Sequence, residues 1–218
     1  METKIVYKFK GDTIMSKTTN LLTFQNTKLG GKIPQLNMPY AITCRPDAPC
    51  FKECYCTHGN MAFNSVRQSH KNKLDLYLSN PKAFFEKIDS EMQFITYKYF
   101  RYHAAGDIVD AKYLELMCWL ARRHKETHFL CFTKKYELVN EYLNSHKKPV
   151  NLILVLSSWG DWIPENPHNL PTSWVGWGDE RDQNIPRFAY ECPGNCGECP
   201  GTHCFNMNKG QSVVFHKH

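Results

Sequence analysis

The middle of the chain alternates between apolar runs with the spacing of buried strands and segments with the spacing of amphipathic helices. Residues 151–156 contain an unbroken run of Leu, Ile and Val, which is typical of a parallel strand buried on both faces. The segment 128–132 predicts a second strand, and the β-rich segment 94–103, broken by a turn, predicts a third. Strands that alternate with helices predict parallel βαβ units with right-handed connections.

Three helices complete the alternation. The first is expected to have Pro81 at its first position and to bury apolar residues as far as Met92. The second is capped by Asp110, and its apolar residues between 114 and 121 fall on one face. The third covers about 135–145. The sequence therefore predicts an α/β fold, either a partial (βα) barrel or an open parallel sheet, with ligands at the carboxyl ends of the strands.

A single domain accounts for the whole chain of 218 residues. Within it we distinguish a basic N-terminal segment (1–36), a βα core (37–163), and a long loop with a cysteine-rich segment (164–218). The periodicity is lost over 164–191, where Pro, Asn, Gly and Trp dominate, so this part is expected to be a loop or flap over the ligand-binding edge. A composition with 42% hydrophobic and 22% charged residues excludes a disordered chain.

The number of cysteines changes this picture. The chain has no apolar run near the ~18 residues of a membrane span and no signal-peptide pattern, so we expect it in the cytoplasm, where structural disulfides are rare. Ten cysteines then need another explanation. Cys118 lies on an apolar helix face and Cys131 in a core strand, and we interpret both as small core residues.

The first cluster of cysteines lies in the loop that precedes the βα alternation. Cys44, Cys50 and Cys54 fall within eleven residues, and two prolines between them favour a tight loop that can wrap a metal centre. Cys56 follows directly and is either a further ligand or a neighbour of the centre. His58 is another candidate for a fourth position, as is Asp107.

The second cluster contains Cys192, Cys196, Cys199 and Cys204, and three glycines let the backbone turn sharply between them. A four-cysteine run of this density indicates a metal site. Zinc ribbons favour two C-x2-C knuckles, whereas iron–sulfur spacings are more compact and varied, so we expect one or two iron–sulfur clusters of the [4Fe-4S] type. Zinc remains the alternative, and the two loops either share a centre or hold one each.

Polar residues that follow predicted strands are candidates for catalysis or binding. Arg101 either binds an anionic group or pairs with Asp107 or Glu115. Asp107 is either a base or cofactor-amine acceptor, or a helix-capping acid. Lys134 either holds a phosphate or carboxylate or is solvated, and Ser157 ends the most buried strand. The tryptophans at 159, 162, 174 and 177 either stack on a nucleobase or sugar or cover the cluster from solvent, and we favour the covering role.

The charge of the chain indicates less about its function than the cysteines do. The formal net charge is +6, and segment 1–36 carries six Lys against Glu2 and Asp12. This pattern is either a footprint for nucleic acid or a solvated surface, and we favour the solvated surface. No nucleotide-binding glycine loop and no hydrolase motif is found.

Several motifs together resemble a family of phage and mobile-element proteins called gene product 88. They are C-x5-C-x3-C from Cys44, F-R-Y-H-x-x-G-D ending at Asp107, F-T-K-K around Lys134, L-S-S around Ser157, and the C-terminal cysteines followed by V-V-F-H-K-H. The resemblance runs from about Asn26 to His218. It implies an origin in phages or mobile elements and no particular activity.

The chain is similar in a second way to radical S-adenosylmethionine enzymes. Those enzymes place three cysteines in the loop after the first barrel strand and an acidic turn after the second strand. The resemblance implies that Tyr55 flanks the cluster loop and that Gly106 and Asp107 supply the turn that holds S-adenosylmethionine. The chain departs from the C-x3-C-x2-C pattern of these enzymes. Cys50 and Cys54 match its first two cysteines, but Thr57 stands where the third cysteine is expected.

Two hypotheses follow. In the first, the protein is an iron–sulfur enzyme with redox or radical chemistry on a small molecule or nucleotide, and S-adenosylmethionine is a candidate cofactor. In the second, it is a scaffold that zinc stabilises and that binds nucleic acid or protein without catalysis.

Overall fold

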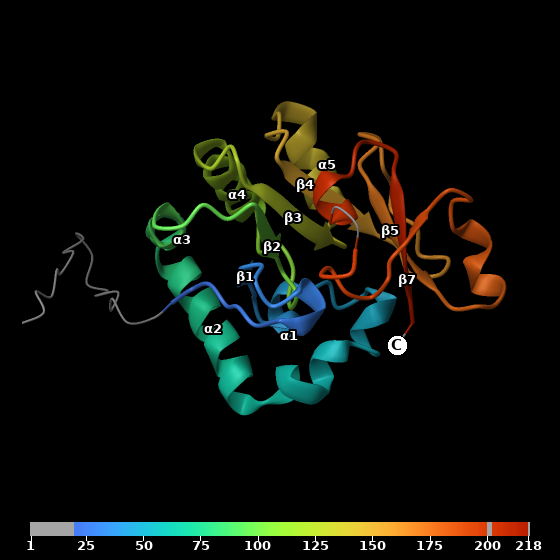
Figure 1. Ribbon diagram of the computed structural model, residues 1–218, viewed down its shortest axis with the longest axis horizontal. Coiled ribbons are helices and arrows are strands. Elements are labelled where there is room, and N and C mark those ends of the chain that lie inside the picture. The colour runs from blue at the N-terminus through green and yellow to red at the C-terminus, as the bar shows by residue number, and fades with distance from the viewer. Residues whose placement is uncertain (1–19, 200–201, 218) are drawn as a thin grey trace, which may run out of the picture.

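The computed structural model describes residues 20–199 and 202–217, and these form a parallel sheet of seven strands in the order β1-β2-β3-β4-β5-β7-β6 (Figure 1). The strands are β1 (Gln35–Leu36), β2 (Tyr99–Tyr102), β3 (His128–Thr133), β4 (Leu152–Ser157), β5 (Thr172–Gly176), β6 (Tyr190–Glu191) and β7 (Ser212–His216). The helices are α1 (Tyr40–Thr43), α2 (Asn64–Ser79), α3 (Pro81–Gln93), α4 (Ala111–Arg123) and α5 (Tyr136–Ser145). Short 3-10 turns lie at Thr27–Leu29, Pro49–Phe51, Tyr55–Thr57, Gly59–Ala62, Glu180–Asn184 and His203–Asn206.

The order of the strands explains where the helices lie. Strands β1 to β5 are neighbours in the sheet in the same order as in the chain. Because parallel connections are right-handed, a sheet that grows in one direction receives its crossover helices on one face. The expected α/β fold with a parallel sheet is confirmed. The pairing of the strands is that of an open sheet, with β1 and β6 at its two ends.

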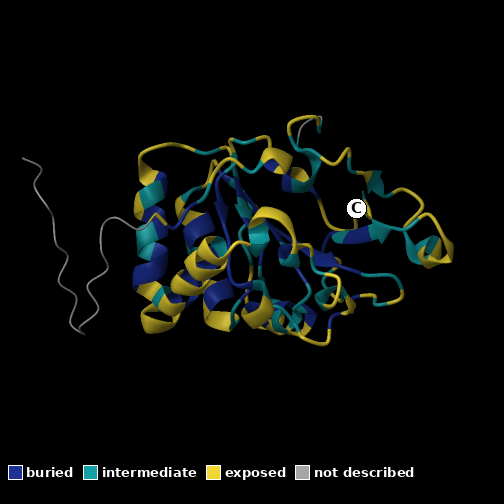
Figure 2. Cartoon of the chain, turned by 90° about the horizontal axis from the view of Figure 1, so that it is seen from below, coloured by how far each residue is buried: buried dark blue, intermediate teal, exposed yellow. Residues whose placement is uncertain are grey.

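The two faces of the sheet have different partners. On one face, alternate residues such as Phe100, Phe129 and Leu154 pack against the helices in the larger core (Figure 2). On the other face, Leu130 and Val155 pack against Phe205 and further residues of the C-terminal segment. This two-residue alternation is the geometry of a strand with both faces covered.

The loop after β6 reaches the segment that precedes β1. The backbone N–H of Cys196 donates to the carbonyl of Lys28 at 2.8 Å. Gly30 and Gly197 approach so closely that a Cβ on Gly30 would lie 3.4 Å from the Cα of Gly197. The cysteine-rich loop therefore connects the two ends of the open sheet.

The helix starts and the buried strand that the sequence predicts in the central part of the chain are confirmed. Asn80 caps α3 through its side chain, with Pro81 in the first turn, and Asp110 caps α4 by accepting from the backbone N–H of Tyr113. The strand expected over 151–156 is β4, and all of its residues are buried. These strands and helices bound the loops that follow β2, β3 and β4.

Other expectations need correction. The segment 164–191 is not one long loop, because it contains β5 and β6. The strand expected over 94–103 is restricted to β2, while Phe94 is 87% exposed. Helix α2 was not expected. Of the basic segment 1–36, residues 1–19 lie outside the described residues.

In the described part of the chain, no helix has the length and apolar character needed to cross a membrane.

Gly106 gives a direct test of how closely the loops pack. Its φ is +82°, and a Cβ there would lie 2.6 Å from the backbone oxygen of Met38. We expect Gly106→Ala to lower the free energy of unfolding by about 3 kcal/mol, because backbone strain adds to the clash. Gly59→Ala is the matched control, since Gly59 has φ +54° with nothing within 4 Å, and should cost only about 1 kcal/mol. Equal losses in urea denaturation would contradict this account.

Candidate metal and ligand site

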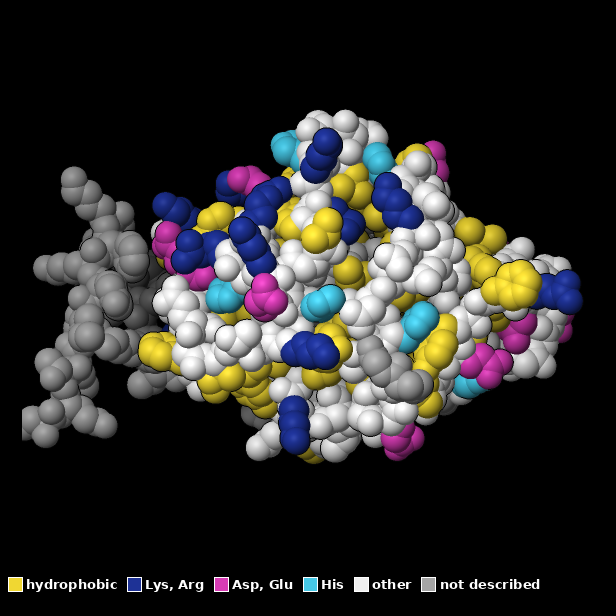
Figure 3. All heavy atoms as spheres, turned by 45° about the horizontal axis from the view of Figure 1, so that its top comes forward, with side chains coloured by type: hydrophobic (Ala, Val, Ile, Leu, Met, Phe, Trp, Pro, Cys, Tyr) yellow, Lys and Arg dark blue, Asp and Glu magenta, His cyan; other side chains and the backbone are white. Residues whose placement is uncertain are grey.

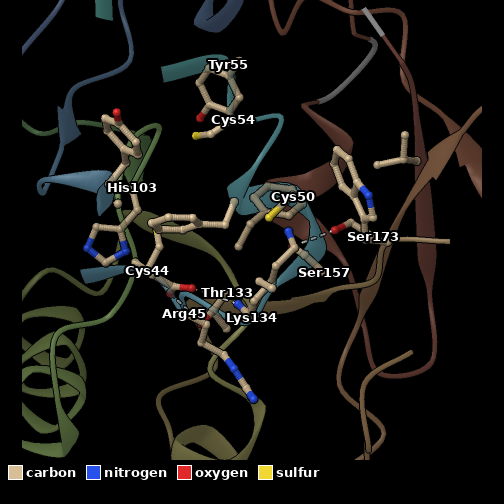
Figure 4. A pocket seen from close by; sticks show the side chains of 18 of the residues that line it. Cys44, Arg45, Cys50, Cys54, Tyr55, His103, Thr133, Lys134, Ser157 and Ser173 are labelled. Atoms are coloured by element: carbon tan, nitrogen blue, oxygen red, sulfur yellow. Dashed lines mark hydrogen bonds between the residues drawn. The ribbon is translucent and has the colours of Figure 1, made fainter. Parts of the chain in front are cut away.

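A pocket of about 230 Å³ opens at the carboxyl ends of the strands (Figure 4). This is the edge at which parallel α/β sheets bind ligands. Its walls come from segments far apart in the sequence: the loop after β1, the ends of β2, β3 and β4, and parts of β5 and β7. The sequence-predicted residues that line it are Cys44, Cys50, Cys54, Tyr55, Arg101, Gly106, Asp107, Lys134 and Ser157.

The first cysteine cluster forms one wall of this pocket. Cys44 ends α1, Cys50 lies in a 3-10 turn that Pro49 begins, and Cys54 precedes the next 3-10 turn. The three side chains line the same pocket and lie close enough for each of Cys50 and Cys54 to raise the pKa of Cys44 electrostatically. Among the His, Cys, Asp and Glu side chains of residues 20–199 and 202–217, no group of three or more is already arranged to hold a metal ion. The loop brings its sulfurs to one cavity without metal-ligand geometry.

The three thiols have different protonation behaviour. Burial, and next the charge of Asp107, raises the pKa of Cys44 to about 12. Burial also raises the pKa of Cys50, against the opposing effect of Lys134. A hydrogen bond from the Cys56 thiol lowers the pKa of Cys54 to about 6, although burial acts in the opposite direction. In the metal-free loop, Cys54 is therefore the thiolate at neutral pH.

Lys134 extends from the end of β3 toward Cys50 (Figure 4). Its Nζ lies 5.9 Å from the ring centre of Trp159, on the far wall. Its ammonium group forms no ion pair with a carboxylate in the part of the chain that the structure describes. The neighbouring Lys135 points elsewhere and donates to the carbonyl of Val109 at 2.9 Å. Lys134 thus places an unpaired positive charge beside the cysteine loop.

Asp107 is buried and fully engaged with backbone and hydroxyl donors. Its Oδ1 accepts from Thr133 Oγ1 at 2.6 Å and from the backbone N–H of Ile108 at 2.7 Å. Its Oδ2 accepts from the backbone N–H of Lys134 at 2.9 Å, and its own N–H donates to Thr43 Oγ1 at 3.0 Å. Burial raises the pKa of Asp107 against the lowering effect of these hydrogen bonds. The alternative role of helix cap falls to Asp110, and Asp107 instead joins three loops.

Arg101 points to the opposite face of β2 from the helices. Its guanidinium lies 4.2 Å from the ring centre of Phe132, and its Nε donates to the carbonyl of Tyr102 at 2.9 Å. It pairs with neither Asp107 nor Glu115, and the described residues supply it with no other carboxylate. Burial raises the pKa of Cys196 and Cys204, two thiols of the second cluster, and the positive charge of Arg101 opposes this rise.

Arg101 and His103 do not share a face, contrary to the alternation expected along this strand. His103 follows β2 with φ +55°, which breaks the alternation. Its ring lies on the helix side, within 3.1 Å of the Tyr113 hydroxyl and 3.5 Å of Cys131 Sγ. Burial lowers the pKa of His103 to about 3, so the ring is neutral.

The remaining predicted residues complete the walls. Tyr55 is 64% exposed, and its hydroxyl donates to the carbonyl of Ala104. Ser157 is buried, and its Oγ accepts from Ser173 Oγ at 3.0 Å. Trp159 and Trp174 line the pocket, whereas Trp162 packs on Tyr136 outside it.

The second cysteine cluster follows β6. The backbone N–H of Gly194 donates to Cys192 Sγ and that of His203 to Cys199 Sγ, both at 3.4 Å. Burial is the main cause that raises the pKa of Cys204 to about 12, and the other three cysteines of the cluster raise it further. The four sulfurs therefore lie near one another, with backbone donors already directed at two of them.

Sequence reasoning missed several residues of the site. Ser173 and Phe215 line the pocket but were not expected there, whereas Thr133 and Ser158, which also line it, belong to the F-T-K-K and L-S-S motifs. Ser158 and Thr133 directly adjoin the noted Ser157 and Lys134, so the rule that ligands meet the ends of parallel strands finds them. Ser173 lies in no motif, and Phe215 lies in the V-V-F-H-K-H motif; neither could be placed at the pocket, because β5 and β7 were not expected as strands.

The reactivity of Cys54 tests the electrostatics of the metal-free loop. We expect alkylation of Cys54 by iodoacetamide to rise through a midpoint near pH 6, the pKa of this thiol, whereas Cys44 stays unreactive until far higher pH. Cys56→Ala removes the hydrogen-bond donor and should move the midpoint upward, while Cys56→Ser retains a donor and should move it less. Mass spectrometry after timed alkylation measures this, and a midpoint for Cys54 near that of an ordinary thiol would refute it.

Comparison with known proteins agrees with the arrangement of these motifs. The sequence model of one protein family, described as Gene product 88, matches residues 10–174, which include the first cysteine cluster and the ends of β2, β3 and β4. No curated protein and no solved structure matches the chain. The chain belongs to the Gene product 88 family.

Proposed function

We propose that this is an iron–sulfur protein, with one centre held by Cys44, Cys50 and Cys54 and a second held by the cysteines of the C-terminal loop. The observation that carries the proposal is the placement of two half-buried cations. Lys134 faces the first cysteine cluster and Arg101 the second, and neither has a carboxylate partner within the described residues. An unpaired charge away from water is unfavourable, and an anionic metal–thiolate centre is the partner that each cation lacks.

The donor set fits such centres. Thiolates are the ligands that iron–sulfur clusters use, and N–H groups directed at the sulfurs, as at Cys192 and Cys199, stabilise the bound thiolates. Closing the first loop on a cluster requires its sulfurs to move within the pocket they already share. When bound, such a cluster supplies one-electron chemistry, and three protein ligands leave one iron open to a substrate or cofactor.

The residues opposite the cysteine loop define where a substrate lies. Ser157, Ser158 and Ser173 offer hydroxyl groups, and Trp159 offers an aromatic wall. Lys134 reaches between this wall and the cysteines, so it can hold an anionic group of a small molecule or nucleotide. Asp107 fixes the backbone of Lys134 and so positions its side chain.

S-adenosylmethionine is the cofactor we propose for the open position. The cysteine loop follows β1, and Gly106 and Asp107 follow β2, which supports the correspondence with radical enzymes. Against it, three hydrogen bonds already engage the Asp107 carboxylate, and an amine would have to use the remaining lone pair of Oδ2. The close contact of Gly106 with Met38 explains that glycine without a cofactor.

A zinc-stabilised scaffold is the competing function, and the second cluster favours it most. Four cysteines with directed N–H groups suit a structural zinc as well as a cluster. The nucleic-acid part of that hypothesis has less support, because Figure 3 shows Lys and Arg interspersed with acidic and neutral side chains on the face it displays.

Metal and sulfide content decides between these functions. Protein prepared without oxygen should contain about four iron and four acid-labile sulfide atoms per cluster and absorb broadly in the visible range. Cys50→Ser should remove the iron of the first centre alone and Cys199→Ser that of the second, with Cys118→Ser as a control that keeps both. Zinc without sulfide in both loops would overturn the proposal.

Replacement of Lys134 tests the charge argument. Because a positive charge stabilises the reduced, more negative cluster, Lys134→Met should lower the midpoint potential by about 59 mV, a tenfold change in the reduced-to-oxidised ratio for a one-electron couple. Lys112→Met is the control, because its ammonium group pairs with Glu115 on α4 and not with the cysteine loop. A redox titration followed by electron paramagnetic resonance measures both, and equal potentials would count against the role of Lys134.

A further inference from the structure

The segment that carries the first cysteine cluster has a second side. Ile42 lies on it and is 60% exposed. A separate cavity of about 250 Å³ opens between α1 and α2, and its walls are mostly apolar. We call this region the α1–α2 face; Figure 2 is viewed from the side on which these helices lie. Exposed apolar surface of this kind is typical of a contact site for another protein.

One buried polar group faces this cavity without a partner. His70 lines it and is 6% exposed, and its ring forms no hydrogen bond within residues 20–199 and 202–217. Burial, and next the charge of Lys73, lowers the pKa of His70 to about 4, so the ring is neutral. A neutral imidazole offers one donor and one acceptor. The cavity therefore suits an apolar side chain that brings a hydrogen-bonding group with it.

The rim of the cavity is basic. Arg67 and Lys71 line it from α2, and both are exposed. Lys71 pairs with Asp75 at 2.8 Å, whereas Arg67 has no carboxylate partner in the described part of the chain. The acids of the cysteine loop are paired elsewhere, Glu53 with Lys217 at 2.9 Å and Asp47 with Arg45 at 2.6 Å. An apolar cavity with an arginine on its rim that pairs with none of the described carboxylates is complementary to a partner with an acidic surface.

The α1–α2 face lies directly behind the cysteine loop. Tyr40 and Cys56 line both this cavity and the pocket that holds the cysteines, so a single layer of residues separates the two. Cys56 is buried and hydrogen-bonded to Cys54. A partner seated on this face comes close to the first centre without blocking the ligand side of the pocket.

We propose that the α1–α2 face docks a small acidic one-electron carrier protein, of the ferredoxin class, which reduces the first centre. The inference rests on the proposed iron–sulfur function. The step transfers one electron: the carrier is oxidised by one electron and the centre is reduced by one, with no bond made or broken. The modest size of the face fits this class, because electron-transfer encounters bury little surface.

The test compares two reductants on the same anaerobic holoprotein. A reduced plant-type ferredoxin must dock, whereas dithionite needs no docking surface. We expect Arg67→Glu and Ile42→Glu to slow reduction by ferredoxin about tenfold at low salt and to leave reduction by dithionite unchanged. Lys112→Glu, an exposed charge reversal on α4, is the matched control and should match the wild type in both assays.

Each outcome separates the two proposals. If the cluster is present and ferredoxin reduces the Arg67→Glu and Ile42→Glu proteins at the wild-type rate, the docking face is wrong while the iron–sulfur function stands. If Lys112→Glu is slowed as much as Arg67→Glu, the effect comes from net charge and the docking face is again wrong. A protein that holds no cluster overturns both. Slower reduction by ferredoxin alone, with unchanged iron content, supports the docking face.

Discussion

The buried carboxylate of Asp107 holds together the edge of the sheet at which the pocket opens. It accepts hydrogen bonds from Thr133 and from the backbone of Lys134, and its own N–H donates to Thr43. These bonds join the end of α1, the loop after β2 and the end of β3, which are the three segments nearest the first cysteine cluster. A carboxylate in such a place is unfavourable unless its oxygens are satisfied, and here the satisfying donors are the loops themselves. The position of Lys134 beside Cys50 follows from this network.

The central strands and helices could be predicted because the order of apolar and polar residues in each reflects whether it is buried on one face or on both. The run that forms β4 is apolar on both faces, and α4 has an apolar stripe and a side-chain cap at Asp110. Helix α2 gave no such signal, since His70 and Lys73 belong to its buried face and hide the periodicity. Strand β5 lies in a segment rich in Pro, Gly and Trp, and its place in the sheet depends on pairing with β7, which is distant in sequence.

Many of the residues that line the pocket could be identified from the sequence, but their arrangement could not. The cysteine spacing identified both clusters, and the rule that parallel strands end at one edge brought Arg101, Asp107, Lys134 and Ser157 together at the same pocket. The sequence could not show that His103 turns to the helix side, because this depends on a left-handed backbone angle at a residue other than glycine. Nor could it show that none of the described carboxylates pairs with Arg101, since the neighbours of Arg101 come from β3 and the C-terminal loop.

The sheet explains how cysteines near the two ends of the chain approach one side of the molecule. A sheet wound in one direction with its helices on one face leaves the other face open, and the segment after β6 crosses that face to reach Lys28. Arg101 lies on the covered face, between the pocket with the first cluster and the loop with the second. Its charge favours the ionised forms of Cys196 and Cys204, while its side chain lines the pocket of Cys44. This one cation therefore connects the surroundings of the first cysteine cluster, whose pocket it lines, with the thiols of the second.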